Sequence, residues 1–345
     1  MLKISSQTKI FVPAPAGTVT GGAELLHQLV GYLRDHGREA YIVYFGEAEH
    51  SIPPDYGCYN IATANQVEDI VSNIVVIYEG IYNQIALYPN AQKVLWWLSV
   101  DNFFLCSRTF LSPFDYYRYQ KHGLRRMAKL CLHFLMGRNE FKELLSIKKL
   151  ASLNAVNAYQ SEYAQWWLLK HRFPNVVPLK DYINIDHCTS FSIDGREDIG
   201  LYNPKKGFEF TRKLIDLAPD IKWVALQGMS RTQLIEILGK AKVYVDFGYH
   251  PGKDRLPREC AMNGCCVITG KRGSARFFED VSVPDEYKFD EKTARLEDII
   301  ERIRWTLAHY DKAIADFSYY RASIAQEKKE FELQICKLFE ISEEV

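Results

Sequence analysis

Residues 243–270 read VYVDFGYHPGKDRLPRECAMNGCCVITG, and this stretch decides the fold that the sequence predicts. Apolar residues run from 243 to 247 and predict a strand, which Gly248 ends. The loop 250–255 that follows carries His250 and three charged side chains. That is more charge than a loop needs for solubility, so the loop is a candidate ligand site.

The second half of the stretch predicts a short helix and another strand. The helix begins near Pro257, and Gly264 ends it, as a glycine past a helix end commonly does. The apolar residues 265–269 predict the strand. Strand, loop, helix and strand make a βαβ unit, and open α/β sheets bind ligands beyond the carboxyl ends of their strands.

The N-terminal residues predict a second βαβ unit, with strand 9–15, loop 16–22, helix 23–36 and strand 39–45. The loop reads GTVTGG and not GxGxxG, so a dinucleotide-binding fingerprint is absent. Gly21 and Gly22 permit close backbone approach at a helix N-terminus, where amide groups can face an anion. A plain tight turn is the alternative interpretation.

Strands are also predicted at 73–78 and 93–100, and polar and aromatic residues stand at the end of the second. A carboxylate at Asp101 could bind or deprotonate an acceptor hydroxyl, with Trp96, Trp97 and Asn102 beside it. Alternatively, Asp101 only caps a turn, as Asp commonly does. The strand 153–159 and a helix follow, and Pro174, Pro178 and lost periodicity predict a domain boundary near 178–190.

The C-terminal half continues the alternation of strands and helices. Its predicted elements are strand 199–202, helix 208–217 opened by Lys206 and Gly207, strand 221–226, helix 233–240 capped by Ser230, and a short helix 274–279. Residues from 296 onward are mostly helical and strongly charged.

Bulk properties exclude several classes of protein. A chain of 345 residues suits two α/β domains, and 43 basic residues against 43 acidic ones give no indication of nucleic acid as a partner. Eight cysteines without a CxxC pair predict reduced, buried thiols and neither disulfides nor a metal site. Without a signal peptide or an apolar run of about 18 residues, we expect a cytoplasmic protein.

The segment 116–139 is basic and aromatic. It holds six Lys or Arg residues and no Asp or Glu, and three tyrosines stand among its first four residues. Such a segment is typical of a helix on an anionic membrane surface. We therefore predict a membrane-facing insertion at 115–150 that uses Arg118, Lys121, Arg125, Arg126 and Lys129. A solvated helix packed on the core is the alternative.

Three motifs resemble those of one enzyme family. LPRECAMNGCCVITG at 256–270 resembles the C-terminal donor motif of retaining GT-B glycosyltransferases, of the glycosyltransferase family 4 or group 1 type. IGLYNPKKGFEFTRKLI at 199–215 resembles their strand-loop-helix beneath the donor diphosphate. PAPAGTVTGGAELLHQLVGYLRDHG at 13–37 resembles their Gly-Gly-Ala-Glu loop.

This resemblance implies a GT-B fold, in which two Rossmann-like α/β domains face each other across a cleft. Residues 1–180 would form the acceptor-binding domain and 181–310 the nucleotide-sugar domain. Helices at 311–345 could cross back to the first domain.

The resemblance also implies the site residues. The catalytic candidates are Lys206, Arg255 and Asp101. The donor-binding candidates are Gly21, Gly22, Asn203, Lys206, His250, Lys253, Asp254, Arg255, Glu259, Gly273 and Ser274. The acceptor-binding candidates are Glu24, Trp97, Asp101 and Asn102. Lys206 with Arg255 or Lys253 would bind the diphosphate, and Glu259 the ribose hydroxyls.

Two positions depart from the family's pattern. The family usually has an arginine five residues before the lysine, and Leu201 stands there. The first glutamate of its Glu-x7-Glu motif falls at Pro251. The sugar of the donor and the retaining stereochemistry therefore depend on other residues.

The resulting hypothesis is a glycosyltransferase that moves a sugar from a nucleotide sugar to a saccharide or lipid-linked acceptor, in surface polysaccharide or glycolipid synthesis. We expect no cofactor, no metal and no nucleic acid, and a peripheral membrane surface as a partner. Two alternatives are a GT-B-like nucleotide-sugar epimerase, which needs no acceptor, and a non-catalytic saccharide-binding or scaffold subunit.

Overall fold

A computed structural model describes residues 2–107, 147–184 and 192–341, together with Ala128, Leu132 and Met136. The chain divides into two compact units, Met1–Lys180 with Phe331–Val345, and Asp181–Glu330. We call them the first and the second unit. The predicted membrane residues Arg118, Lys121, Arg125, Arg126 and Lys129 lie outside the described residues.

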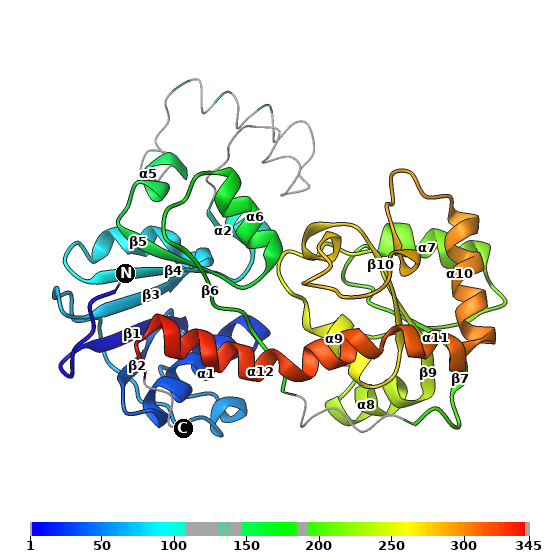
Figure 1. The fold of residues 1–345 in the computed structure, drawn as a ribbon, viewed down its shortest axis with the longest axis horizontal. Helices are drawn as coiled ribbons and strands as arrows, with labels where there is room; N and C mark the ends of the chain where they lie inside the picture. Colours follow the sequence, from blue (N-terminus) through cyan, green and yellow to red (C-terminus); the bar gives the residue numbers. More distant parts are fainter. Residues whose placement is uncertain are drawn as a thin grey trace. The chain divides into compact units, whose positions relative to one another are not determined.

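The first unit is built on a parallel sheet with strands in the order β2-β1-β3-β4-β5-β6 (Figure 1). The strands are β1 (Lys9–Pro15), β2 (Glu39–Phe45), β3 (Ile74–Tyr78), β4 (Gln92–Trp97), β5 (Ala155–Tyr159) and β6 (Val176–Pro178). The helices are α1 (Gly21–Asp35), α2 (Val100–Ser107), α5 (Ile147–Ala151) and α6 (Glu162–Lys170), with 3-10 turns at η1 (Pro54–Tyr56) and η2 (Glu79–Leu87).

The second unit repeats this design with the strand order β11-β10-β9-β7-β8, again all parallel. The strands are β7 (Glu197–Tyr202), β8 (Lys222–Ala225), β9 (Ala241–Asp246), β10 (Cys266–Gly270) and β11 (Lys288–Phe289). The helices are α7 (Phe208–Leu217), α8 (Arg231–Lys240), α9 (Arg255–Met262), α10 (Leu296–Ala308) and α11 (Tyr310–Asp316), with 3-10 turns at η5 (Gly273–Arg276) and η6 (Asp285–Tyr287). Helix α12 (Ser318–Leu338) begins in the second unit, and its residues from Phe331 onward belong to the first unit.

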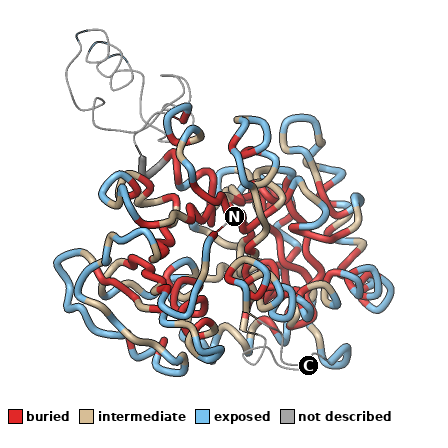
Figure 2. Tube along the Cα trace, turned by 60° about the vertical axis from the view of Figure 1, so that its left-hand side comes forward, coloured by how far each residue is buried: buried red, intermediate tan, exposed pale blue. Residues whose placement is uncertain are grey.

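The strands are apolar because helices cover both faces of a parallel sheet. Figure 2 shows the buried residues concentrated along the strands and on the inner sides of the helices. Val243, Val245 and Ile268 are fully buried in the core of the second unit. Cys265 and Cys266 are buried free thiols there, as the sequence predicted. Within the described ranges, no helix is long and apolar enough to cross a membrane.

Two short strands were not predicted. Val176–Pro178, which the sequence assigned to a linker, is strand β6 at the edge of the first sheet. An edge strand tolerates proline because one side of its backbone needs no partner. Strand β11 has two residues, too few for any periodicity to show.

The helices predicted at 23–36, 208–217, 233–240 and from Pro257 to Gly264 are present, and caps explain where two of them begin. The short helix predicted at 274–279 is instead the 3-10 turn η5 (Gly273–Arg276). Helix α1 begins two residues before the predicted start, because the Thr20 side chain accepts a hydrogen bond from Ala23 N at 3.3 Å. Ser230 caps α8 in the same way, as predicted. Helix α9 begins at Arg255, ahead of Pro257, since the first turn of a helix needs no donor from proline.

A buried charge cluster fixes α9 inside the second unit. The fully buried Arg258 guanidinium donates to Asp181 Oδ2 at 2.7 Å and to Glu327 Oε2 on α12 at 2.8 Å. Lys253 Nζ contacts the other Glu327 oxygen at 2.7 Å. Charges taken out of water must be matched, so loss of one member leaves others uncompensated.

Replacement of Arg258 by leucine should therefore lower the free energy of unfolding by about 3–5 kcal/mol, because two carboxylates stay buried without their cation. Urea titration, and then calorimetry, measures this loss of unfolding free energy. Arg304→Leu is the matched control, since its pair with Asp220 is exposed and its removal should leave the midpoint unchanged. Equal midpoints for wild type and Arg258→Leu would refute the structural role of the cluster.

Candidate functional site

The strand order of the second unit predicts where a ligand binds. Strands β7 and β9 are neighbours, but the chain leaves them toward opposite edges of the sheet, β7 to β8 and β9 to β10. In open α/β sheets, ligands bind outside the carboxyl ends of the strands at such a switch point. The loops after β7 and β9 carry most of the predicted donor-binding residues, so the topology brings them together.

Three glycines hold these loops in contact. Gly207 has φ +64°, and a Cβ there would lie 2.1 Å from the carbonyl oxygen of Phe247. A Cβ at Gly248 would lie 2.7 Å from Lys206 Cβ. Gly273 has φ +55°, and its Cβ would lie 1.9 Å from His250 O. The loops after β7, β9 and β10 therefore interlock through backbone contacts that permit no side chain.

Gly207→Ala should destabilise the protein through two costs. Positive φ costs an L-residue about 1–2 kcal/mol, and forcing the Phe247 backbone aside adds about 1–3 kcal/mol. Gly195→Ala is the matched control, because Gly195 has φ +76° but no atom within 4 Å of its Cβ position. Thermal unfolding should show a clearly larger loss for Gly207→Ala, and equal losses would exclude the close contact.

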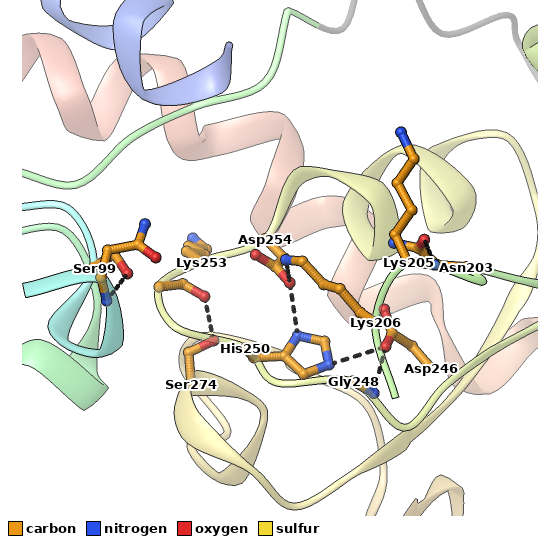
Figure 3. A network of polar contacts seen from close by, with 12 residues as sticks. Ser99, Asn203, Lys205, Lys206, Asp246, Gly248, His250, Lys253, Asp254 and Ser274 are labelled. Carbon is orange, nitrogen blue, oxygen red and sulfur yellow. Dashed lines mark hydrogen bonds and ion pairs between the residues drawn. The ribbon is translucent and has the colours of Figure 1, made fainter. Parts of the chain in front are cut away.

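Lys206 is the cation at the centre of the switch point. It precedes Gly207, the N-cap of α7, and its Nζ donates to Asp254 Oδ2 at 2.7 Å (Figure 3). The neighbouring Lys205 is exposed and points away from Asp254. Asn203 shapes the turn, since its Oδ1 accepts from Lys205 N at 3.0 Å. The structure thus singles out Lys206 of the two lysines.

His250 lies between two carboxylates. Its ring is fully buried, with Nε2 3.6 Å from Asp246 Oδ1 and Nδ1 3.6 Å from Asp254 Oδ2. Burial by itself lowers the pKa of His250, but the charges of Asp246 and Asp254 outweigh burial and raise the pKa above its ordinary value. The ring links β9 to the residue before α9 and, because it is fully buried, is not exposed to a ligand.

Glu259 is held by two arginines. Its Oε2 accepts from Arg231 at 3.0 Å, and Arg255 lies 3.7 Å from its Oε1. Glu259 has a side-chain exposure of only 8%, whereas Arg255 is 32% exposed and is the first residue of α9. The pair offers a cation near a helix N-terminus and a carboxylate oriented by its neighbours.

The other predicted donor residues stabilise the loop. Lys253 is 8% exposed and pairs with Glu327, so its charge is balanced inside the second unit. The prediction that it is an alternative ligand of the diphosphate is therefore not supported. Ser274 Oγ donates to Gly252 O at 2.6 Å, and Ser274 N donates to His250 O at 2.9 Å. Gly273 and Ser274 thus fasten the loop that carries His250.

In the first unit, Gly21 and Gly22 are the first residues of α1, after β1 and at the β1–β3 switch point. A Cβ at Gly22 would make only a normal van der Waals contact, 3.8 Å from the Leu98 side chain. Internal packing therefore does not require glycine at this position. Glu24 accepts a hydrogen bond from Tyr59 OH at 2.9 Å.

Two of the four predicted acceptor residues, Trp97 and Asp101, are buried. Trp97 is fully buried, and its Nε1 donates to Asn157 at 3.2 Å, so the prediction that it faces a ligand is wrong. The reason is that Trp97 is the last residue of β4, and helices still cover both faces of the parallel sheet at this point. Asp101 is 4% exposed and accepts from Tyr163 OH at 2.9 Å. Asn102 is exposed, and its backbone N donates to Ser99 Oγ.

The sequence analysis missed a buried carboxylate in the first unit. Glu79 follows β3 directly, is 2% exposed, and accepts a hydrogen bond from Leu98 N at 2.8 Å. Burial raises the pKa of Glu79 to about 8, although the backbone hydrogen bond from Leu98 opposes this. An acidic residue directly after an apolar strand was the signal in the sequence, as it is for Asp246 after β9.

The raised pKa of Glu79 makes stability depend on pH. The folded protein holds this proton up to about pH 8, while the unfolded chain releases it near pH 4.5, so stability falls as pH rises between these values. Glu79→Gln should remove this contribution. Its melting temperature should exceed that of wild type at pH 8 and approach it at pH 5, whereas a difference independent of pH would contradict the raised pKa.

Comparison with known proteins was made for both sequence and structure. No family model and no curated protein matches the sequence. Sucrose-phosphate synthase from Thermosynechococcus elongatus is similar in structure, with a TM-score of 0.64, 13% identity, and coverage of 97% of this chain and 98% of that chain. WaaG, a glycosyltransferase involved in lipopolysaccharide biosynthesis, gives a TM-score of 0.52, 11% identity, and coverage of 97% and 100%.

An α-glucosyltransferase in complex with UDP and a 13-mer DNA is also similar, with a TM-score of 0.52, 11% identity, and coverage of 96% and 98%. These neighbours are GT-B glycosyltransferases, so the fold of this chain is the GT-B fold with two Rossmann-like units. The α/β fold that the sequence predicted is confirmed.

Proposed function

We propose that this protein is a glycosyltransferase that moves a sugar from a nucleotide-sugar donor to a saccharide or lipid-linked acceptor. The observation that carries the proposal is Lys206, presented before the N-terminus of α7 at the β7–β9 switch point. A cation beside backbone amides that lack partners is suited to bind a diphosphate.

Glycosyl transfer requires that the charge growing on the leaving diphosphate be stabilised. Lys206 and Arg255 are the residues that we assign to this task, because fixed cations are most effective where the charge develops. Glu259, oriented by Arg231, would accept hydrogen bonds from the ribose hydroxyls. Gly21 and Gly22 would let the α1 backbone approach the phosphates. From the family resemblance, we also propose that the transfer is retaining and needs no metal.

Asp254 was predicted to bind the donor, and we assign it a different role, as the partner of Lys206. A carboxylate that bound the donor would repel the diphosphate, but Asp254 can neutralise Lys206 until the donor arrives. Asp254 and the diphosphate would then compete for the same cation. His250, 3.6 Å from Asp254, is placed to receive the carboxylate when Lys206 is taken.

The similar structures support the donor class, since one of them is complexed with UDP. The acceptor is assigned by chemistry alone: a saccharide or a lipid-linked saccharide, in surface polysaccharide or glycolipid synthesis, at the inner face of the cytoplasmic membrane. Because the α-glucosyltransferase is complexed with DNA, the exclusion of nucleic acid as an acceptor remains a prediction. A sedimentation assay with anionic vesicles tests the membrane partner.

Lys206→Ala should abolish binding of nucleoside diphosphates and lower the rate of transfer by about 100-fold or more, the usual loss when one group that stabilises developing charge is removed. A thermal-shift screen with UDP, GDP, ADP and their hexose conjugates measures binding, since a ligand of the folded state raises the melting temperature. Chromatography of the products measures transfer.

Lys205→Ala is the matched control, because it removes the same charge one residue away and should leave binding unchanged. Equal shifts for the two variants would sink the assignment of Lys206. If none of the nucleotides shifts the wild-type protein, the glycosyltransferase proposal fails.

Asp254→Asn should tighten binding of the selected nucleoside diphosphate by about three- to tenfold, because it removes the anion that competes for Lys206. Asp254 makes no side-chain cap of α9, so the substitution leaves the helix start intact. Titration calorimetry at low and high salt measures the effect, which should shrink with salt. Weaker binding would mean that Asp254 orients Lys206 and does not compete.

A further inference from the structure

An ion pair between the buried Glu291 and the partly exposed Arg272 lies at the carboxyl ends of β10 and β11. Glu291 stands two residues after the end of β11, and Arg272 lies between β10 and η5. The Glu291 side chain is 3% exposed, whereas that of Arg272 is 40% exposed. The guanidinium contacts the carboxylate and is the cover between Glu291 and solvent.

The Glu291 carboxylate has Arg272 as its ion-pair partner but no well-formed hydrogen bond among the described residues. Neither of its oxygens accepts one of good geometry from the residues that the structure describes. A buried acceptor without a donor costs free energy, and a charged one costs more. Burial accordingly raises the pKa of Glu291 to about 7, although Arg272 acts to lower it.

Asp246 and Glu79, two other buried carboxylates of the described residues, do accept hydrogen bonds. Asp246 accepts from Tyr244 OH at 2.7 Å and from Gly248 N at 2.8 Å. Glu79 accepts from Leu98 N at 2.8 Å. The missing donors at Glu291 are therefore a property of that position and not of the interior in general.

The backbone leaves room for this carboxylate. Gly270 ends β10, and a Cβ at Gly270 would lie 2.5 Å from Glu291 Oε1. Any larger residue would push the carboxylate out. Glycine at position 270 thus leaves space for the Glu291 carboxylate, although few interactions in the fold stabilise that carboxylate.

The pair adjoins the proposed donor site within the same unit. Arg272 lies over the Tyr249 ring at 5.4 Å, and the next residue, Gly273, packs against His250 O. The loop with Tyr249 and His250 is the one that also carries Asp254 and Arg255. Glu291 therefore lies next to the loops after β9 and β10, which carry the proposed donor site.

We propose that Glu291 and Arg272 form a subsite for the hydroxyl groups of the transferred sugar. Glu291 accepts hydrogen bonds from the hydroxyl groups of the sugar, which act as the donors that the carboxylate otherwise lacks. Arg272, a single flexible side chain, covers the carboxylate in the empty site and moves onto substrate oxygens when the donor binds. The subsite rests on the proposed function, because it presupposes a nucleotide sugar.

The test separates the sugar from the nucleotide. Titration calorimetry compares wild type with Glu291→Gln and Asp290→Asn. Each protein is titrated with a nucleoside diphosphate and with its hexose conjugate. The pair is the one that wild type binds among UDP with UDP-glucose, GDP with GDP-mannose, and ADP with ADP-glucose. Asp290→Asn is the matched control, since it removes an exposed carboxylate one residue away and asparagine can still accept from Lys292 N.

Glu291→Gln should bind the nucleoside diphosphate as wild type does. Its affinity for the nucleotide sugar, relative to the nucleotide, should fall about tenfold or more, the usual effect of losing hydrogen bonds to a charged group. Asp290→Asn should change neither affinity. Melting temperature at pH 8 gives a second readout: it should rise or stay equal in Glu291→Gln, because the carboxylate does not stabilise the fold.

An unchanged ratio of the two affinities in Glu291→Gln would overturn the subsite while leaving the proposed function intact. A large drop in melting temperature for Glu291→Gln would likewise overturn it, by making Glu291 a structural residue. Absence of nucleotide binding by the wild-type protein would instead overturn the glycosyltransferase proposal and the subsite with it.

Discussion

The site of the second unit depends on backbone contacts among three loops. Gly207, Gly248 and Gly273 each stand where a Cβ would lie within 2.7 Å of another loop, so the loops after β7, β9 and β10 meet at distances that only glycine permits. These contacts lie at the point where the strand order reverses, which is where an open α/β sheet receives its ligand. Lys206, Asp254, Arg255 and Glu259 are positioned by these loops or by the helix that follows one of them, so their arrangement follows from this packing.

The charged side chains on these loops and helices form ion pairs with one another. Lys206 faces Asp254, and Arg231 and Arg255 face Glu259. Paired side chains keep their orientation, and in the function proposed above a diphosphate would replace one anionic partner of Lys206 with another. Arg258, by contrast, is fully buried with its carboxylates and holds α9 in place without access to a ligand. The same residue types therefore serve binding or anchoring according to their exposure.

Sequence periodicity predicted the longer elements because each has a regular apolar pattern. Helix α7 after Lys206 and Gly207, and α8 after Ser230, begin where their cap residues indicated. Periodicity could not reveal β6 and β11, which have three and two residues. It also placed Trp97 toward a ligand, because an aromatic residue at a strand end looks the same in sequence whether it faces solvent or a covered sheet. The domain limits and the membrane-facing segment remain predictions.

The sequence by itself determined the alternation of strands and helices, the glycines of the loops and the candidates Lys206, Arg255 and Glu259, because these depend on local pattern and on residue type. Only the tertiary structure decided which of the candidates meet. It paired Lys253 with Glu327 and turned it away from ligand, buried His250 between two carboxylates, and brought Glu291 beside Arg272. The reason is physical: partners, burial and therefore the pKa values of His250, Glu79 and Glu291 arise from residues far apart along the chain, and no local pattern records them.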